Sequence, residues 1–151
     1  MPWQSTLGVF DVVRSPEGGG VKFYASFEIL DSSGRVFTTT DLDNRTVAAV
    51  MTANFEIGKG SENDPIVGFV EDISQDGAVA STLVIGETDD VNYSETTDED
   101  PDLGDKVVTD GDGEVKQTPD SASTGAGSRP VGRGHVIHKD TTTKMVRLLW
   151  P

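Results

Sequence analysis

Three carboxylates at alternate positions are the strongest chemical feature of the sequence. Asp110, Asp112 and Glu114 are separated by Gly111 and Gly113, and carboxylate oxygens at such spacing can bind Ca²⁺. The run lacks the twelve-residue spacing and the terminal glutamate of an EF-hand loop. Two Asp-Gly steps between β-rich runs are, in contrast, a strong hairpin signal. The sequence therefore predicts a tight turn here, without a metal ion.

The two histidines are the next candidates for chemistry. His135 and His138 lie three residues apart in a β-rich run, where such residues point to opposite faces, so a shared metal ion is not expected. The chain has no cysteine, which excludes disulfides, thiolate metal sites and cysteine nucleophiles. We therefore expect no metal and no cofactor, and both histidines are predicted to be surface or interface residues.

Catalytic signatures are also missing from the sequence. There is no Gly-x-Ser-x-Gly nucleophile elbow, and the glycines at 18–20 are not followed by the Gly-Lys-Ser/Thr of a phosphate-binding loop. An acidic chain offers many carboxylates for glycoside chemistry, but no pair stands out. We therefore expect that the protein is not an enzyme, with a small carboxylate-dependent hydrolase as the rival class.

The elements that would position these residues have mainly the pattern of short β-strands. Apolar residues alternate with polar ones at 21–28, which is typical of a half-buried strand. Further strands are expected at 9–13, 35–40, 66–70, 78–85, 106–109, 114–117, 131–137 and 144–150. The sequence predicts a mainly β protein, either a compact β-barrel (β-tulip-like) or a sandwich, with one short helix.

The one helix is expected at residues 43–54. Asp43 can cap its N-terminus, Leu42 precedes the cap, and Val47, Val50 and Met51 fall on one face of a helix.

Charge is distributed unevenly along the chain of 151 residues. The formal net charge is -14, which disfavours nucleic acid and anionic membrane surfaces as partners. Residues 87–120 carry a net charge of -11, whereas residues 121–151 carry +4. Like-charge runs are usually solvated, and an acidic surface poor in lysine is also typical of adaptation to high salt.

The domain organisation follows from these patterns. We expect an N-terminal arm at residues 1–8 and a single β-rich domain at 9–151. Within that domain, residues 87–105 are predicted to be an exposed acidic loop, and residues 118–129 a mobile loop rich in small and polar residues. Residues 1–7 lack a signal-peptide pattern and no run is long enough to span a membrane, so synthesis in a cytoplasm is expected.

The second half of the chain resembles a known family. Residues 103–115 form a Gly-Asp-x-Val-x-x-Asp-x-x-Gly-x-Val-like hairpin, residues 129–132 read Arg-Pro-Val-Gly, and residues 145–149 read Met-Val-Arg-Leu-Leu. This order resembles the capsid cement, or head decoration, proteins of tailed viruses over roughly residues 65–150. The acidity is similar to that of proteins from viruses of salt-loving archaea.

The resemblance implies a function as well as a fold. It implies a homotrimer that binds the major capsid protein of an HK97-like shell, on the outer surface of the virion head, after the shell expands. A turret or spike protein at the capsid vertices, which would be pentameric, is the alternative within the same class. A carbohydrate- or receptor-binding virion module is the alternative from another class, although only two Trp and two Tyr are present.

Interface residues follow from this expectation. A tryptophan is a favoured anchor at protein interfaces, and basic residues of the C-terminal part can face an acidic capsid surface or pair with this chain's own acidic loop. Trp150 can equally belong to the core. The candidate capsid or subunit contacts are Trp3, Leu7, Arg129, Arg133, Arg147 and Trp150. Two glycosylation sequons, at Asn44 and Asn92, complete the candidate sites.

Overall fold

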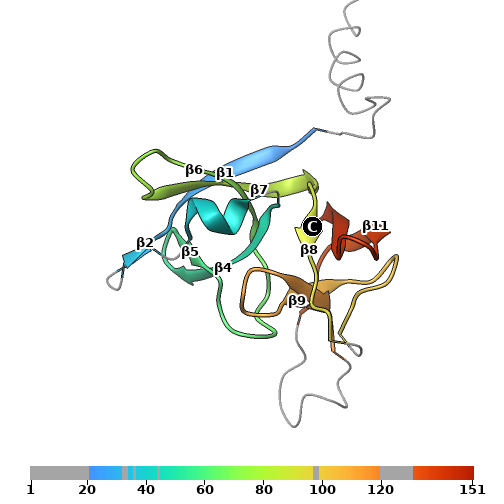
Figure 1. Ribbon diagram of the computed structural model, residues 1–151. Coiled ribbons are helices and arrows are strands. Elements are labelled where there is room, and N and C mark those ends of the chain that lie inside the picture. The colour runs from blue at the N-terminus through green and yellow to red at the C-terminus, as the bar shows by residue number, and fades with distance from the viewer. Residues whose placement is uncertain (1–20, 32–33, 36, 44, 97–98, 120–130) are drawn as a thin grey trace, which may run out of the picture.

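The computed structural model describes residues 21–31, 34–35, 37–43, 45–96, 99–119 and 131–151. The strand expected at 9–13 and nearly all of the loop expected at 118–129 lie outside these residues. The described part is mainly β, as predicted, and its central feature is a closed five-stranded barrel (Figure 1).

The barrel closes because its last strand pairs back to its first. The five strands follow the order β1 (Phe23–Glu28), β5 (Glu56–Gly58), β4 (Val47–Ala53), β6 (Gly68–Ile73) and β7 (Val79–Glu87). Antiparallel pairing of β1 with β7 completes the ring, with Phe23 opposite Ile85 and Glu28 opposite Val79. In the closed ring, each of the five strands has a neighbour on both sides along at least part of its length.

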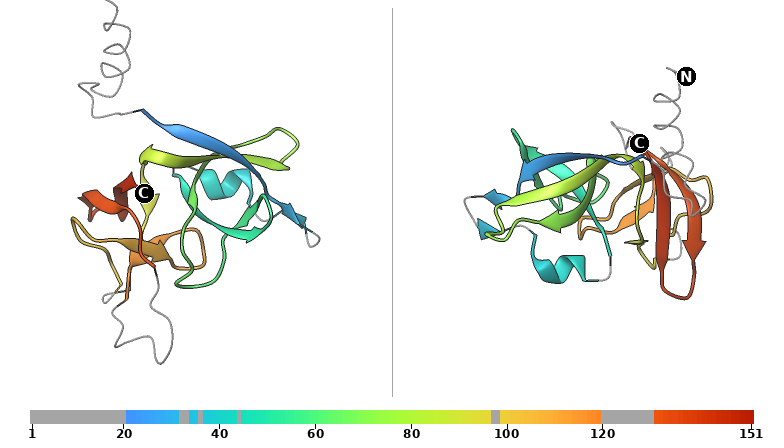
Figure 2. Two further views of the ribbon diagram at one scale, coloured as in Figure 1. Left: turned by 180° about the vertical axis from the view of Figure 1, so that it is seen from behind. Right: turned by 90° about the horizontal axis from the view of Figure 1, so that it is seen from above.

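A second layer extends from the end of β7. β12 (Met145–Trp150) pairs with β7, with β8 (Val91–Asn92) and with β11 (His135–Asp140), which is the last strand of the sheet. β9 (Val107–Thr109) and β10 (Val115–Gln117) form the hairpin predicted around the Asp-Gly steps. Figure 2 shows β11 and β12 as a ribbon set against one end of the barrel.

The small remaining elements lie between β1 and β4. β2 (Leu30–Asp31) and β3 (Gly34–Arg35) pair with each other, and a single 3₁₀ turn, η1 (Thr39–Leu42), follows. The run expected as a strand at 35–40 therefore becomes the end of β3 and the start of this turn. The Asp41 carboxylate accepts the Thr38 backbone N–H (2.7 Å), which ends the extended conformation there. No described helix is long and apolar enough to cross a membrane.

Two hydrophobic cores hold the layers together. The barrel interior is filled by Ile29, Phe37, Val47, Ala49, Ile57, Val70 and Ala80. The other core lies between the barrel wall and the C-terminal strands, and it contains Ala48, Ile66, Phe69, Leu83, Val91, Tyr93, Val107, Val115, Val136, Val146, Leu148 and Trp150. One wall of the barrel is therefore buried on both of its faces.

The helix expected at 43–54 is wrong, and the double burial explains why. This segment forms β4, whose residues Val47 to Val50 are all buried. Val47 and Ala49 face the barrel interior, whereas Ala48 faces the second core. Burial on both faces removes the alternation of polar and apolar residues that identifies a half-buried strand. The only described helical element is the 3₁₀ turn at Thr39–Leu42.

Candidate interaction surface

Three large apolar side chains on adjacent strands are exposed. Phe23 on β1, Ile85 on β7 and Leu149 on β12 are 55%, 50% and 52% exposed. Phe23 lies opposite Ile85, and Leu149 lies opposite Glu87, two residues after Ile85. We call these three exposed side chains on the paired strands β1, β7 and β12 the apolar row.

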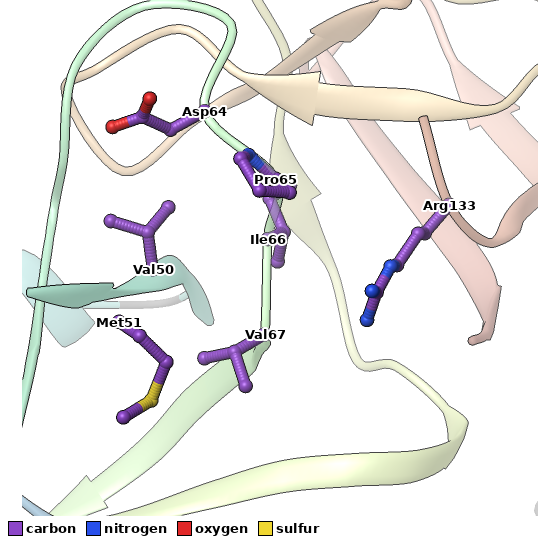
Figure 3. A pocket seen from close by; sticks show the side chains of 7 residues that line it. All are labelled: Val50, Met51, Asp64, Pro65, Ile66, Val67 and Arg133. Atoms are coloured by element: carbon purple, nitrogen blue, oxygen red, sulfur yellow. The ribbon is translucent and has the colours of Figure 1, made fainter. Parts of the chain in front are cut away.

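A pocket of about 380 Å³ opens at another place, beside β4. Val50 and Met51 line it from β4, residues 64–67 run alongside them, and Arg133 lies on the other side of that segment in the view of Figure 3. Val50 is buried, whereas Met51 is 45% exposed. Adjacent residues of a strand point to opposite faces, so both can line one pocket only where the pocket lies at the strand's edge.

Arg133 differs from the other predicted basic contacts. Its backbone is fixed by a pair of hydrogen bonds with Val107, each 3.1 Å long. Its side chain is exposed and makes no ion pair with any described residue. Asp64, on the same pocket, is engaged in its own loop, where its carboxylate accepts the Ser61 N–H at 2.8 Å.

Two other described basic residues of the C-terminal part, Lys139 and Arg147, bind the chain's own acidic segment. Arg147 donates from Nε to Asp90 Oδ1 (2.8 Å), and this hydrogen bond raises the pKa of Arg147. Lys139 donates to Asp100 (2.9 Å) and Asp102 (3.0 Å), which raise its pKa, and its ammonium lies 5.4 Å from the centre of the Tyr93 ring. The sequence left two partners open for the basic residues, an acidic capsid surface and the chain's own acidic segment. In the structure, Arg147 is paired with the acidic segment.

Trp150 is a core residue. Its side chain is 3% exposed and meets Phe69 edge-on, with ring centroids 4.9 Å apart and an interplanar angle of 90°. The indole N–H donates to the Val67 carbonyl at 3.4 Å. Its place among the interface candidates is therefore corrected, since a side chain so covered offers almost no surface to a partner.

The acidic segment at 87–105 is only partly an exposed loop. Val91 and Tyr93 are buried in the second core, and β8 pairs with β12. The prediction of a solvated loop failed because two apolar residues among many carboxylates anchor the segment. The sequon at Asn92 lies in this packed part, where Ser94 donates to Glu99 at 3.3 Å, while Asn44 lies outside the described residues.

A nearly buried lysine ties two acidic loops together. The side chain of Lys116 on β10 is 3% exposed, and its ammonium donates to Glu62 and to Glu99 (3.0 Å). Burial acts to lower the pKa of Lys116, but the two carboxylates outweigh it and the pKa is raised. The same contact lowers the pKa of Glu62. Nothing in the sequence pattern of 115–117 indicated this pairing.

The carboxylates at 110, 112 and 114 form a turn, as predicted. Asp110 Oδ1 accepts the backbone N–H groups of Asp112 (2.8 Å) and Glu114 (3.1 Å), so backbone donors occupy it. Burial and the charge of Asp110 raise the pKa of Glu114. Within the described ranges, no group of three or more His, Asp or Glu side chains is arranged to hold a metal ion.

The two histidines lie on one face of β11, not on opposite faces. A β-bulge between Val136 and His138 adds one residue, so His135 pairs with Leu149 and His138 with Arg147. Both histidines are exposed, and His135 Nδ1 lies 3.1 Å from the Gly104 carbonyl oxygen. Sequence reasoning missed the bulge because no glycine or proline stands in the strand at that point.

The remaining predicted contacts, Trp3, Leu7 and Arg129, lie outside the described residues. The apolar row and the pocket were not predicted. The alternation at 21–28 placed Phe23 correctly in a strand, but which strand face is left uncovered depends on the pairing of β7 with β12. Comparison with family models, with curated proteins and with solved structures finds no match for this chain.

Proposed function

We propose that this chain is a capsid decoration (cement) protein, a homotrimer that binds the major capsid protein on the outer surface of a viral head. The observation that carries the proposal is the apolar row of Phe23, Ile85 and Leu149. Large apolar side chains exposed on neighbouring strands are costly to leave in water, and covering them supplies the main driving force for association. The motif resemblance to cement proteins indicates which partner covers them.

The electrostatics favour apolar rather than ionic attachment. Arg147 is already paired within the chain, so it adds little to the attraction of an acidic capsid surface. A surface with net charge -14 instead keeps the protein soluble and opposes wrong partners until a well-fitting apolar contact forms.

Binding to expanded shells of the major capsid protein, measured by co-sedimentation, tests the proposal. Ile85→Asp places a charge in the apolar row and should weaken shell binding at least about tenfold, because one buried aliphatic side chain contributes on the order of 1.5–3 kcal/mol. The matched control is Phe55→Asp, since Phe55 is 77% exposed in the β4–β5 turn, where its carbonyl accepts the N–H of Glu28. Unchanged binding of Ile85→Asp, or equal losses in both variants, would overturn the proposal.

A mass measurement in high salt tests the oligomeric state. The proposal predicts a trimer, either in solution or on the shell. A pentamer would favour the alternative placement at the capsid vertices, and a monomer that ignores shells would contradict both.

A further inference from the structure

The pairing of β4 with β6 ends partway along β4, and we call the gap beyond this point the seam of the barrel. β4 pairs with β6 only from Val47 to Ala49, and the Val67 N–H donates to the Ala49 carbonyl (2.8 Å) at the end of this ladder. Beyond it, β4 is paired with β5 alone, with Met51 opposite Ile57 and Ala53 opposite Glu56. On the other side Pro65 has no N–H to donate, so the ladder cannot continue there.

The pocket beside Met51 lies in this seam, and its chemistry is specific. Its walls are mainly aliphatic, from Val50, Met51, Ile66 and Val67. The one cation at its rim, Arg133, has no described ion-pair partner, whereas Asp64 is engaged by the Ser61 N–H. The site therefore combines an apolar cavity larger than one leucine side chain with one guanidinium that is free among the described residues.

We propose that this pocket binds an extended segment of a partner protein that carries a leucine-sized side chain next to a carboxylate. The apolar side chain fills the cavity between β4 and residues 64–67, and the carboxylate pairs with Arg133. A guanidinium presents a planar fork of donors that matches a carboxylate. The guanidinium, unpaired among the described residues, offsets locally the repulsion that a chain of net charge -14 exerts on a carboxylate.

Under the proposed function, the segment belongs to the capsid subunit. The pocket proposal does not depend on that function, because its test uses a small probe and no shell. A failed probe with intact shell binding would reject the pocket alone, whereas probe binding without shell binding would reject the proposed function alone.

The probe is N-acetyl-leucine, which has both the side chain and the free carboxylate. Titration into ¹⁵N-labelled full-length protein in high salt should shift the amide signals of Met51, Ile66 and Val67, with a Kd on the order of millimolar for a ligand of this size. N-acetyl-leucinamide lacks the negative charge. It should bind about fivefold more weakly or worse, because a charge-assisted pair of hydrogen bonds to the guanidinium is lost. Equal binding of the amide, or no shifts with either compound, would overturn the proposal.

Two matched variants locate the charge. Arg133→Gln should raise the Kd for N-acetyl-leucine to that of the amide probe. Lys144→Gln removes another exposed cation without a described ion-pair partner, in the turn before β12, and should leave the Kd unchanged. The spectra themselves report whether each variant is folded. An unchanged Kd in Arg133→Gln, or an equal loss in Lys144→Gln, would contradict the assigned role of Arg133.

Discussion

Lys116 shows how single residues hold the acidic loops to the body of the protein. Its ammonium is almost fully covered, yet two carboxylates from distant parts of the chain, Glu62 and Glu99, reach it. A buried ammonium is tolerated only when paired and hydrogen-bonded, and removing it takes away the charged partner that both carboxylates share. This contact is therefore expected to contribute more than the exposed ion pairs of the same chain.

Replacing this lysine tests that expectation. Lys116→Met keeps an unbranched side chain of similar length. It should lower the free energy of unfolding by about 1–2 kcal/mol, because two charge-assisted hydrogen bonds are lost and only partly replaced by water. Lys59→Met is the matched control, since Lys59 pairs with Asp41 at 2.8 Å but is 31% exposed, and it should cost under about 0.5 kcal/mol. Urea unfolding measures both, and a Lys116→Met variant as stable as the wild type would contradict the assigned role.

The same cluster has a defined dependence on pH. The pKa of Glu62 is lowered in the folded state, so its contribution is present above the ordinary pKa of 4.5 and is lost as the pH falls through the lowered value. The stability difference between wild type and Lys116→Met should therefore shrink in acid. A difference that stays constant down to pH 3, about 1.5 pH units below the ordinary glutamate pKa of 4.5, would speak against this linkage.

Glu114 has the opposite behaviour. Its pKa is raised by burial and by Asp110, so the folded state binds the proton more tightly than the unfolded state does. Stability then falls as the pH rises from 4.5 through the raised pKa, and the cost is fully present at neutral pH. Glu114→Gln should raise the free energy of unfolding at pH 7 by roughly 0.5 kcal/mol or less, because the carboxylate is only partly buried and its charge is screened by solvent. Thermal unfolding at pH 7 and pH 4 checks this, and a gain that persists in acid would contradict it.

At the scale of elements, β4 decides the fold and is the part that sequence reasoning got wrong. A strand buried on both faces has no alternation, and Val47, Val50 and Met51 happen to match a helical spacing as well. Only the tertiary arrangement, with a barrel on one side and β8 to β12 on the other, distinguishes the two. The hairpin at 106–117 was predictable because its turn chemistry is local, and the strand at 21–28 because one of its faces is exposed.

Ala49→Leu separates the two interpretations of this segment. In the barrel, Ala49 is fully buried in the interior, so the larger side chain should overpack it and lower the free energy of unfolding by about 1–3 kcal/mol. In a helix with Val47, Val50 and Met51 on the apolar face, position 49 would lie on the opposite, exposed side and tolerate leucine. Urea unfolding of Ala49→Leu measures the cost, and a neutral effect would contradict the barrel assignment.

The candidate site was only partly accessible to sequence reasoning. Arg133 was predicted as a contact residue and does line the pocket, whereas Trp150 proved to be core. A tryptophan can either anchor a partner protein or fill a core. Trp150 fills the core because its ring packs edge-on against Phe69, a tertiary contact that the sequence does not reveal. The seam beside Met51 arises from the end of the β4–β6 ladder, which no local pattern encodes.

For the whole molecule, the dominant force beyond the two cores is the repulsion within a chain of net charge -14. Several acidic groups of the 87–105 segment are fastened by cations, among them Asp89 by Lys22 and Asp90 by Arg147. Salt weakens such exposed pairs but also screens the larger excess of carboxylates. Because the carboxylates outnumber the cations, we expect the screening of repulsion to outweigh the weakening of ion pairs, so that concentrated salt raises the free energy of unfolding.

A thermal unfolding series in KCl tests this balance. The unfolding midpoint should rise by several degrees between about 0.1 M and 2 M KCl, because the Debye length falls from about 10 Å to below 3 Å and the excess carboxylates no longer repel one another. The same series in the Lys116→Met variant should keep the same slope, since one pair contributes little to the total field. A midpoint that falls with salt would mean that the internal ion pairs outweigh the repulsion.

Under the proposed function, this chain acts by adhesion, through the apolar row, to the surface of a viral shell. A cryo-electron microscopy map of shells decorated with the wild-type protein tests it most directly. For a bound homotrimer we expect threefold-symmetric density on the shell, with Phe23, Ile85 and Leu149 in van der Waals contact with the major capsid protein or with a neighbouring copy. Undecorated shells, or bound copies whose apolar row faces the solvent, would contradict it.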